Sequence, residues 1–230
     1  MIRHRPSVKR GRTRLDWLDS YHSFSFGDFF DPHAMGFRSL RVINEDRIAP
    51  GSGFPTHGHK DMEILTYVIE GSLSHKDSLG NGSTIRPGEV QIMSAGTGIL
   101  HSEFSAPDVM THLLQIWLLP ERAGLTPRYA QEAYSATPNA LVPLCARDPG
   151  AAPVMILQDA TISLGEWMPD HVEAFSFPAS RHAYVQLIAG VLEVNGIRLE
   201  PGDAAEISSE SQLKLATRDM AAKFLFFDLA

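Results

Sequence analysis

The stretch YVIEGSLSHKDSLGNGSTIRPGEVQIMS, residues 67–94, recurs in altered form as VQLIAGVLEVNGIRLEPGDAAEISS at residues 185–209. Each copy has a β-type run, a glycine turn, a second run, a Pro-Gly-acid turn and a third run. In the turns at residues 87–88 and 201–202, proline fixes φ and glycine supplies a positive φ. An internal repeat of this kind predicts two similar β-domains.

Short β-type runs also recur outside the repeat, at intervals of about ten residues, between clusters of Gly, Pro, Asn and Asp, as is typical of an all-β sandwich or barrel. Helical periodicity is scarce. Its best candidate is LTPRYAQEAY, residues 125–134, within a proline-rich connection at residues 120–153. We therefore expect an N-terminal domain over residues 1–125, a C-terminal domain over residues 126–230, and a short helical connection.

The composition narrows the class of protein. With 20 basic and 27 acidic residues the net charge is −7, which argues against direct nucleic-acid binding. The basic start MIRHRPSVKRGRTR is expected to be an edge strand with solvated charges. It does not resemble a signal peptide, because no apolar run follows the charges. No stretch approaches the roughly 20 apolar residues of a membrane helix. A single cysteine, Cys145, allows no internal disulfide and favours a cytoplasmic location.

Two short motifs in the first half of the chain carry metal-binding residue types. FPTHGHKD places His57 and His59 one residue apart, and LHSEF does the same for His101 and Glu103. Side chains at i and i+2 of a strand share one face, so each pair would point in one direction. Two such pairs on facing strands of a small barrel would bring three imidazoles and one carboxylate together. That set suits Fe, Mn, Co, Ni, Cu or Zn and leaves open positions for a reactant.

The repeat serves as an internal control for this site. An HxH pair alone also occurs on solvated strands, so the downstream HxE motif and the repeat are needed to support it. A purely structural need for these residues would be expected in both copies. The corresponding positions of the second copy hold residues without a metal-binding set: Ser176, Pro178, Leu215 and Thr217.

The spacing leaves the identity of the carboxylate ligand open. Glu63 lies four residues after His59 with the same parity and could reach the metal if the strand continues. Asp61 and His75 are poorer candidates, and His75 is expected on a solvated hairpin.

HGHKDMEILTYVIEGSLSHKDSLGN, followed by RPGEVQIMSAGTGILHSEFS, resembles the pirin branch of the cupin superfamily, bicupin proteins that include bacterial quercetin 2,3-dioxygenases. The resemblance starts at LDWLDSYHSFSFGDFFDP and weakens after about residue 130. It implies an all-β bicupin of two double-stranded β-helix barrels. It also implies one metal held in the N-terminal barrel by His57, His59, His101 and Glu103, with a C-terminal barrel that lacks ligands. Glu63 would then lie beside the ligands and orient them.

The resemblance further implies ring-opening dioxygenation of a flavonol such as quercetin, with release of carbon monoxide. The reactants would be a small aromatic substrate and dioxygen, and Glu103 would take the proton of the substrate hydroxyl. The cofactor would be one divalent transition metal ion, Fe(II) first, with Cu, Mn, Co, Ni or Zn as alternatives. A planar substrate needs an apolar slot. Its expected walls include Phe24, Phe26, Phe54 and Met93, and further candidates are Phe29, Phe30, Ile99 and Leu100.

Two other functions are compatible with the same residues. A pirin-like protein could be a metal-bound redox sensor that acts through protein partners, although no segment of this chain marks a partner surface. An isomerase or hydrolase of small metabolites is a third possibility, because cupin folds host many chemistries.

Overall fold

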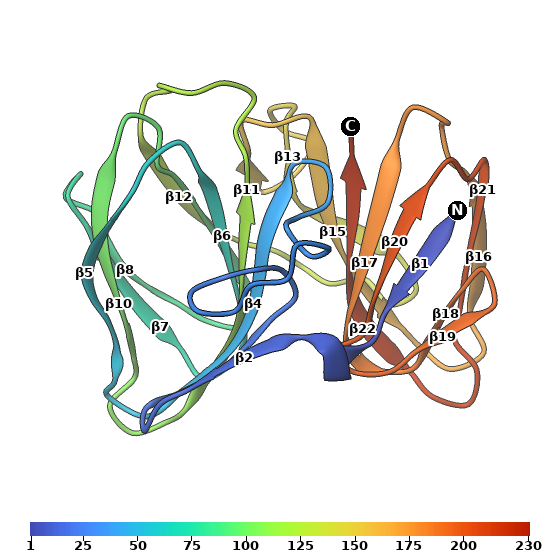
Figure 1. The fold of residues 1–230 in the computed structure, drawn as a ribbon, viewed down its shortest axis with the longest axis horizontal. Coiled ribbons are helices and arrows are strands. Elements are labelled where there is room, and N and C mark those ends of the chain that lie inside the picture. The colour runs from blue at the N-terminus through green and yellow to red at the C-terminus, as the bar shows by residue number, and fades with distance from the viewer. The chain divides into compact units, whose positions relative to one another are not determined.

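The computed structural model describes all 230 residues, and the chain forms two compact units. The N-terminal unit consists of Arg10–Tyr134 and Pro153–Gln158, and the C-terminal unit of Met1–Lys9, Ser135–Ala152 and Asp159–Ala230. Each unit is a β-barrel made of two antiparallel sheets (Figure 1), so the predicted all-β bicupin is confirmed. Neither unit is a single run of sequence, and both take segments from beyond the expected border after residue 125.

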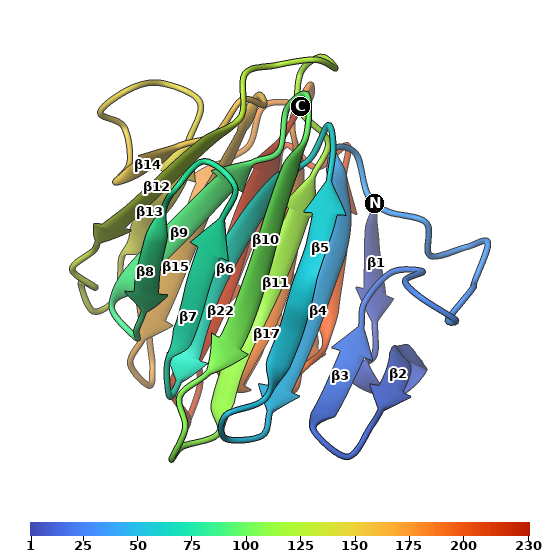
Figure 2. The ribbon, with the colours of Figure 1, turned by 90° about the vertical axis from the view of Figure 1, so that its left-hand side faces the viewer.

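The N-terminal unit pairs a seven-stranded sheet of order β12-β9-β6-β11-β4-β3-β2 with a four-stranded sheet of order β5-β10-β7-β8. Figure 2 shows β5, β10, β7 and β8 in front of the larger sheet. The strands of these two sheets are β2 (Gly11–Arg14), β3 (Leu18–His22), β4 (Leu40–Ile48), β5 (Gly53–His59), β6 (Glu63–Glu70), β7 (Leu73–Asp77), β8 (Gly82–Ile85), β9 (Glu89–Ser94), β10 (Ile99–Ser105), β11 (Thr111–Leu118) and β12 (Arg128–Ala133). The short strand β14 (Val154–Met155) also belongs to this unit but to neither of these sheets.

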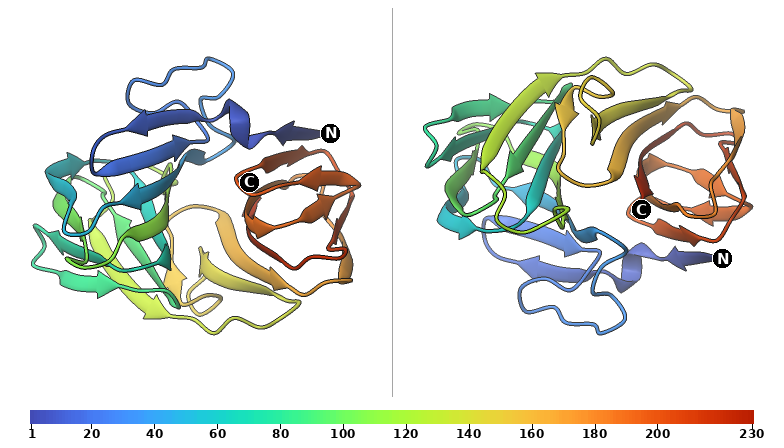
Figure 3. Two further views of the ribbon diagram at one scale, coloured as in Figure 1. Left: turned by 90° about the horizontal axis from the view of Figure 1, so that it is seen from below. Right: turned by 90° about the horizontal axis from the view of Figure 1, so that it is seen from above.

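The C-terminal unit repeats the arrangement. Its larger sheet runs β1-β20-β17-β22-β15-β13 and its smaller sheet β16-β21-β18-β19. Figure 3 shows these strands closing into a ring when the unit is seen end-on. Its elements are β1 (Ile2–Arg5), the 3₁₀ turn η1 (Ser7–Lys9), β13 (Leu141–Ala146), β15 (Ala160–Trp167), β16 (Val172–Ser176), β17 (His182–Gly190), β18 (Leu192–Val194), β19 (Ile197–Leu199), β20 (Ala204–Ser208), β21 (Gln212–Ala216) and β22 (Ala222–Leu229).

Burial alternates along the strands that close each barrel, as a half-buried sheet requires. In β10 the residues Ile99, His101, Glu103 and Ser105 are buried, while those between them are more exposed. The C-terminal barrel is filled by a cluster of apolar side chains that includes Trp167, Phe177, Leu213, Leu215, Phe224 and Phe226. A smaller cluster in the N-terminal barrel includes Leu18, Ile48, Val68, Leu73, Ile85 and Leu113.

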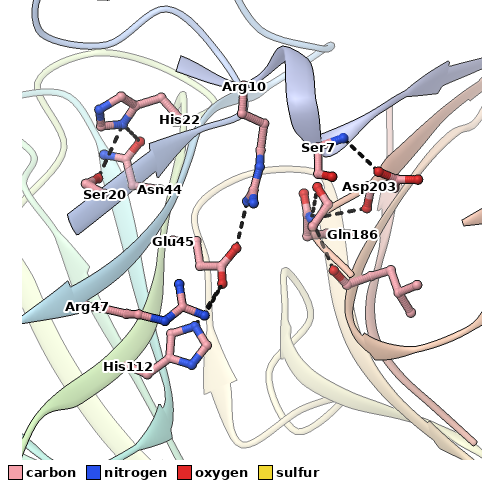
Figure 4. A network of polar contacts seen from close by, with 12 residues as sticks. Ser7, Arg10, Ser20, His22, Asn44, Glu45, Arg47, His112, Gln186 and Asp203 are labelled. Carbon is pink, nitrogen blue, oxygen red and sulfur yellow. Dashed lines mark hydrogen bonds and ion pairs between the residues drawn. The ribbon is translucent and has the colours of Figure 1, made fainter. Parts of the chain in front are cut away.

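The two ends of the chain take different places in their sheet, and the basic start is the edge strand that the sequence predicts. The basic start forms β1, which pairs only with β20 and is therefore an edge strand. The last strand, β22, lies between β17 and β15 in the middle of its sheet. Asp203, which follows the Pro-Gly turn of the second copy, also contacts the start of the chain: the backbone N–H of Ser7 donates to Asp203 Oδ1 at 2.7 Å (Figure 4).

The expected helical connection is wrong. The segment predicted as helix contains β12, which pairs in register with the free edge of β9. Tyr134, just after it, stacks on Tyr67 at a centroid distance of 6.2 Å. Pairing with a strand some 40 positions earlier in the chain overrides the weak local preference for helix. Among the helices of the structure, none is both long and apolar enough to cross a membrane.

The matched glycine turns of the repeat, Gly71 and Gly190, have φ of 75° and 78°. A Cβ on Gly190 would also overlap the backbone carbonyl of Ala221. Gly196 has a φ of 83°, but no atom lies within 4 Å of where its Cβ would be. An alanine at Gly196 would therefore add backbone strain alone, whereas an alanine at Gly190 would add both backbone strain and steric overlap.

We expect Gly196→Ala to lower the free energy of unfolding by about 1–2 kcal/mol through left-handed strain. Gly190→Ala should cost about 1–3 kcal/mol more, because the new methyl group has no space. Urea denaturation of both variants measures the difference. Equal losses would show that the turn relaxes around the added methyl group.

Candidate metal centre

Three histidines converge at one end of the four-stranded sheet. His57 and His59 come from β5 and His101 from β10, and these strands are neighbours in the same sheet, not strands that face each other across the barrel. The cross-strand pairing places His101 opposite His57. One ligand-type nitrogen of each ring lies within 4.8 Å of the others, and the ring centroids are 4.4–4.8 Å apart.

A β-bulge in β5 lies next to this group. Three steps along β5, from His57 to Phe54, face two steps along β10, from His101 to Glu103. The extra residue turns Phe54 to the face of His57. His57 Nδ1 lies 2.8 Å from the Pro55 carbonyl oxygen, which can only accept a hydrogen bond, so Nδ1 carries the proton. In the neutral ring, His57 Nε2 then presents a lone pair.

A chain of two hydrogen bonds fixes His101 in a matching way. Asp77 Oδ2 lies 3.2 Å from His75 Nε2, and His75 Nδ1 lies 3.4 Å from His101 Nδ1. The carboxylate accepts the Nε2–H of His75, so His75 Nδ1 is left to accept the Nδ1–H of His101. His101 Nε2 is therefore also without a proton. This role contradicts the expected solvated position of His75, which is 3% exposed and stacks on Tyr129.

The two bare nitrogens face each other: His101 Nε2 lies 3.0 Å from His57 Nε2. With no proton between them the lone pairs repel, whereas a cation would satisfy both. Burial, together with the neighbouring histidines, lowers the pKa of His101 to about 3, and burial with His57 lowers that of His59 to about 4. Rings that are neutral at pH 7 are in the form that binds transition metals. The donor set therefore fits such an ion.

Glu103 is 2% exposed and lies close to His101, but it is not in the group of three histidines. A carboxylate oxygen lies within 4.8 Å of ligand-type nitrogens of His75 and His101. The amide of Gln115 donates to Glu103 Oε2 at 2.8 Å, and the Trp117 indole N–H donates to Gln115 Oε1 at 3.4 Å. Burial raises the pKa of Glu103 to about 7, although the Gln115 bond opposes the shift.

A cavity of about 460 Å³ opens onto His57, His59 and Glu103. Phe26, Phe54 and Trp117 form aromatic walls, with Trp117 edge-on to His59 at 4.9 Å and to Phe26 at 5.4 Å. A second part of the lining is polar and includes Thr13, Ser20, His22, Asp28, Asn44, Asp46, Thr56 and Gln115.

The other residues expected at the site lie elsewhere. Phe24 and Met93 are 1% and 0% exposed and do not line the cavity. Glu63 is buried, and its Oε2 accepts hydrogen bonds from Ser94 Oγ at 2.9 Å and from the Leu157 N–H at 3.0 Å. No hydrogen bond joins Glu63 to the three histidines.

The polar lining could not be predicted from the sequence, because NEDR at residues 44–47 is polar at four successive positions and does not show which face of the strand is buried. Gln115 and Trp117 were not predicted either. They are two residues apart on one strand and so share a face, which is the signal that the sequence offered for them.

Comparison with known proteins finds one family model for each half of the chain. The family model Pirin matches residues 4–118, and the model for the quercetinase C-terminal cupin domain matches residues 144–229. The chain belongs to the pirin family. The predicted resemblance to pirins is thus confirmed, and the pirin match includes all three histidines.

Two pirin-family relatives and one solved structure illustrate the similarity. "Quercetin 2,3-dioxygenase" of Escherichia coli (strain K12) is 41% identical over 232 residues, covering 100% of this chain and 99% of the relative. "Pirin-like protein" of Caulobacter vibrioides is 36% identical, covering 96% and 97%. The crystal structure of the bacterial pirin YhhW from Escherichia coli in complex with nickel(II) is 40% identical, has a TM-score of 0.94, and covers 100% and 99%.

Asp77→Asn tests the hydrogen-bond chain that fixes His101. Asparagine keeps an acceptor for the Leu79 and Asn81 N–H groups that bond Asp77 Oδ1, but its amide can donate to His75 Nε2. His75 would then donate to His101 Nδ1, which would move the His101 proton to Nε2. We expect affinity for a divalent transition ion to fall about 10–100-fold, measured by chelator competition.

The matched control is Lys76→Ala, at an exposed position on the same strand. It should leave metal affinity unchanged. Equal affinity in the Asp77→Asn variant and the wild type would show that Asp77 does not set the His101 tautomer.

Proposed function

We propose that this pirin-family protein is a metal-dependent dioxygenase that opens the ring of a flavonol such as quercetin and releases carbon monoxide. The observation that carries the proposal is the pair of unprotonated Nε2 atoms of His57 and His101, 3.0 Å apart, beside an aromatic-walled cavity of about 460 Å³. The name of the Escherichia coli relative, quercetin 2,3-dioxygenase, supports the same reaction class.

The proposed ligands are His57, His59, His101 and Glu103, with Glu103 joining the three histidines through its place beside His101. Fe(II) is the proposed ion, and Cu, Mn, Co, Ni and Zn are alternatives that this donor set also accepts. The related pirin that binds nickel(II) supports a divalent ion. When bound, the ion would lower the pKa of a coordinated hydroxyl group and keep positions open for substrate and dioxygen.

The residues of the chain would position the substrate and move its proton. Phe26, Phe54 and Trp117 would hold a planar ring and exclude water from it. Gln115 holds Glu103 Oε2, so Glu103 Oε1 is left to take the proton of the substrate hydroxyl. Trp117 orients Gln115 and touches the substrate slot, which would couple the slot to the position of the base.

The proposed reactants are therefore a small aromatic substrate and dioxygen. The net charge of −7 argues against direct binding of nucleic acid. A cytoplasmic location stays a prediction, supported by the one cysteine, Cys145, which is buried.

Replacement of a ligand should remove the metal but not the fold. We expect His57→Ala and His101→Ala to abolish metal retention, since each removes one of two facing nitrogens. The fold should be kept, because the apolar clusters of both barrels contain neither residue. Elemental analysis and circular dichroism measure the two effects. His33→Ala, at an exposed histidine, is the control, and undiminished metal in a ligand variant would remove that residue from the set.

Oxygen uptake tests the reaction. Metal-loaded protein should consume dioxygen in the presence of quercetin, bleach the flavonol absorbance and release carbon monoxide. Metal-stripped protein should do none of these, and reloading should restore them. If the loaded protein consumes no oxygen and leaves the flavonol spectrum intact, the dioxygenase proposal fails for this substrate and the redox-sensing alternative is left.

A further inference from the structure

Most of the polar part of the cavity lining lies on the sheet opposite the histidines. Thr13 comes from β2, Ser20 and His22 from β3, and Asn44 and Asp46 from β4. Their cross-strand pairs are Thr13 with Ser20, His22 with Asn44 and Ser20 with Asp46. These side chains therefore form one continuous polar strip, while the histidines belong to β5 and β10.

Alternation along β4 separates this strip from a second polar group. Figure 4 shows Ser20, His22 and Asn44 joined together, and Glu45 in a separate group with Arg10, Arg47 and His112. Glu45 is fully paired: it accepts from Arg10 at 2.7 Å and lies 2.9 Å from His112 Nε2. Its neighbour Asp46 points the other way, toward the cavity.

Both ring nitrogens of His22 have hydrogen-bond partners within the strip. Its Nδ1 lies 2.8 Å from Asn44 Oδ1 and its Nε2 lies 2.9 Å from Thr13 Oγ1. The amide oxygen can only accept, so Nδ1 carries the proton and Nε2 accepts from the Thr13 hydroxyl. Burial lowers the pKa of His22, so the ring is neutral. It holds the strip in place but offers no charge to a neighbouring carboxylate.

Asp46 is the group whose hydrogen bonding is incomplete. It is 2% exposed and takes one hydrogen bond from Ser20, yet its Oδ1 is buried and has no partner. No arginine or lysine pairs with it, and it belongs to neither group of metal-ligand type. A buried carboxylate oxygen without a donor is costly and rare in native proteins. Burial raises the pKa of Asp46 to about 6, which is consistent with that missing partner.

We propose that Asp46 determines substrate specificity by accepting a hydrogen bond from a substrate hydroxyl remote from the one that faces the histidines. The inference rests on the proposed function, and it narrows the substrate class to aromatic compounds with hydroxyl groups at two separate places. The two ends of such a molecule would engage opposite sheets of the barrel, one at His57 and His59 and the other at Asp46 and Ser20.

Asp46→Leu tests the proposal, because leucine has a similar shape and no acceptor. The probes are quercetin, which has hydroxyls on several rings, and 3-hydroxyflavone, which keeps only the hydroxyl next to its carbonyl. Metal-loaded protein is titrated with each compound without oxygen. We expect the Kd for quercetin to rise about tenfold or more, the loss expected for a hydrogen bond to a charged group. The Kd for 3-hydroxyflavone should change by less than about twofold.

Two further variants make the test specific. Asp46→Asn keeps an acceptor for Ser20 and preserves the local packing, so it should show a smaller loss for quercetin in the same direction, even if the leucine variant folds poorly. Glu45→Gln, at the adjacent position on the opposite face, should leave both dissociation constants unchanged. Thermal unfolding of Asp46→Leu should show only a small loss of stability, because the variant gives up the single hydrogen bond from Ser20 and the other replaced oxygen, Oδ1, has no partner to lose.

The outcomes separate this inference from the proposed function. If wild-type protein consumes oxygen with quercetin but the Asp46 variants bind both compounds as wild type does, or lose both equally, the role of Asp46 is wrong and the dioxygenase proposal stands. If wild-type protein binds neither compound and consumes no oxygen, both proposals fail.

Discussion

Two imidazole nitrogens held 3.0 Å apart, with both ring protons directed elsewhere, are the constraint around which the N-terminal barrel is arranged. The arrangement needs a carbonyl acceptor for His57, which the bulge at Pro55 supplies. It also needs an acceptor for His101, which Asp77 supplies through His75. Without a cation the two nitrogens are unsatisfied, so the hydrogen bonds around the site prepare it for binding in advance.

The two barrels differ in what fills their interiors. In the C-terminal unit, Leu215 of β21 is fully buried in an apolar cluster that includes Trp167 and Phe224. In the N-terminal unit the corresponding strand, β10, carries His101, and the barrel keeps a cavity of about 460 Å³. A packed apolar interior stabilises a barrel, whereas a polar cavity does not. The C-terminal barrel therefore has an apolar interior, whereas the N-terminal barrel combines a smaller apolar cluster with an open cavity.

Charge is distributed around the cavity by strand geometry. Glu45 and Asp46 are adjacent in sequence but lie on opposite faces of β4. Although burial opposes it, hydrogen bonds from His112 and Arg10 lower the pKa of Glu45 to about 2, whereas burial raises that of Asp46 to about 6. The cavity thus has histidine nitrogens on one sheet and, on the other, a carboxylate with one oxygen that has no hydrogen-bond partner. A molecule that binds a metal ion held by the histidines at one end and donates a hydrogen bond at the other would match both sides.

The sequence by itself determined the strands and turns of the repeat, the duplication and the pairing of His57 with His59 and of His101 with Glu103. These features depend on the two-residue period of a strand and on the backbone needs of Pro-Gly turns, which are local. Only the tertiary structure decided that residues 128–133 form a strand, that His75 is buried behind His101, that Glu63 lies away from the histidines, and that Asp46 faces the cavity. Each of these depends on which distant segments pair and in what register, and a run such as NEDR fits either face until its neighbours in the sheet are fixed.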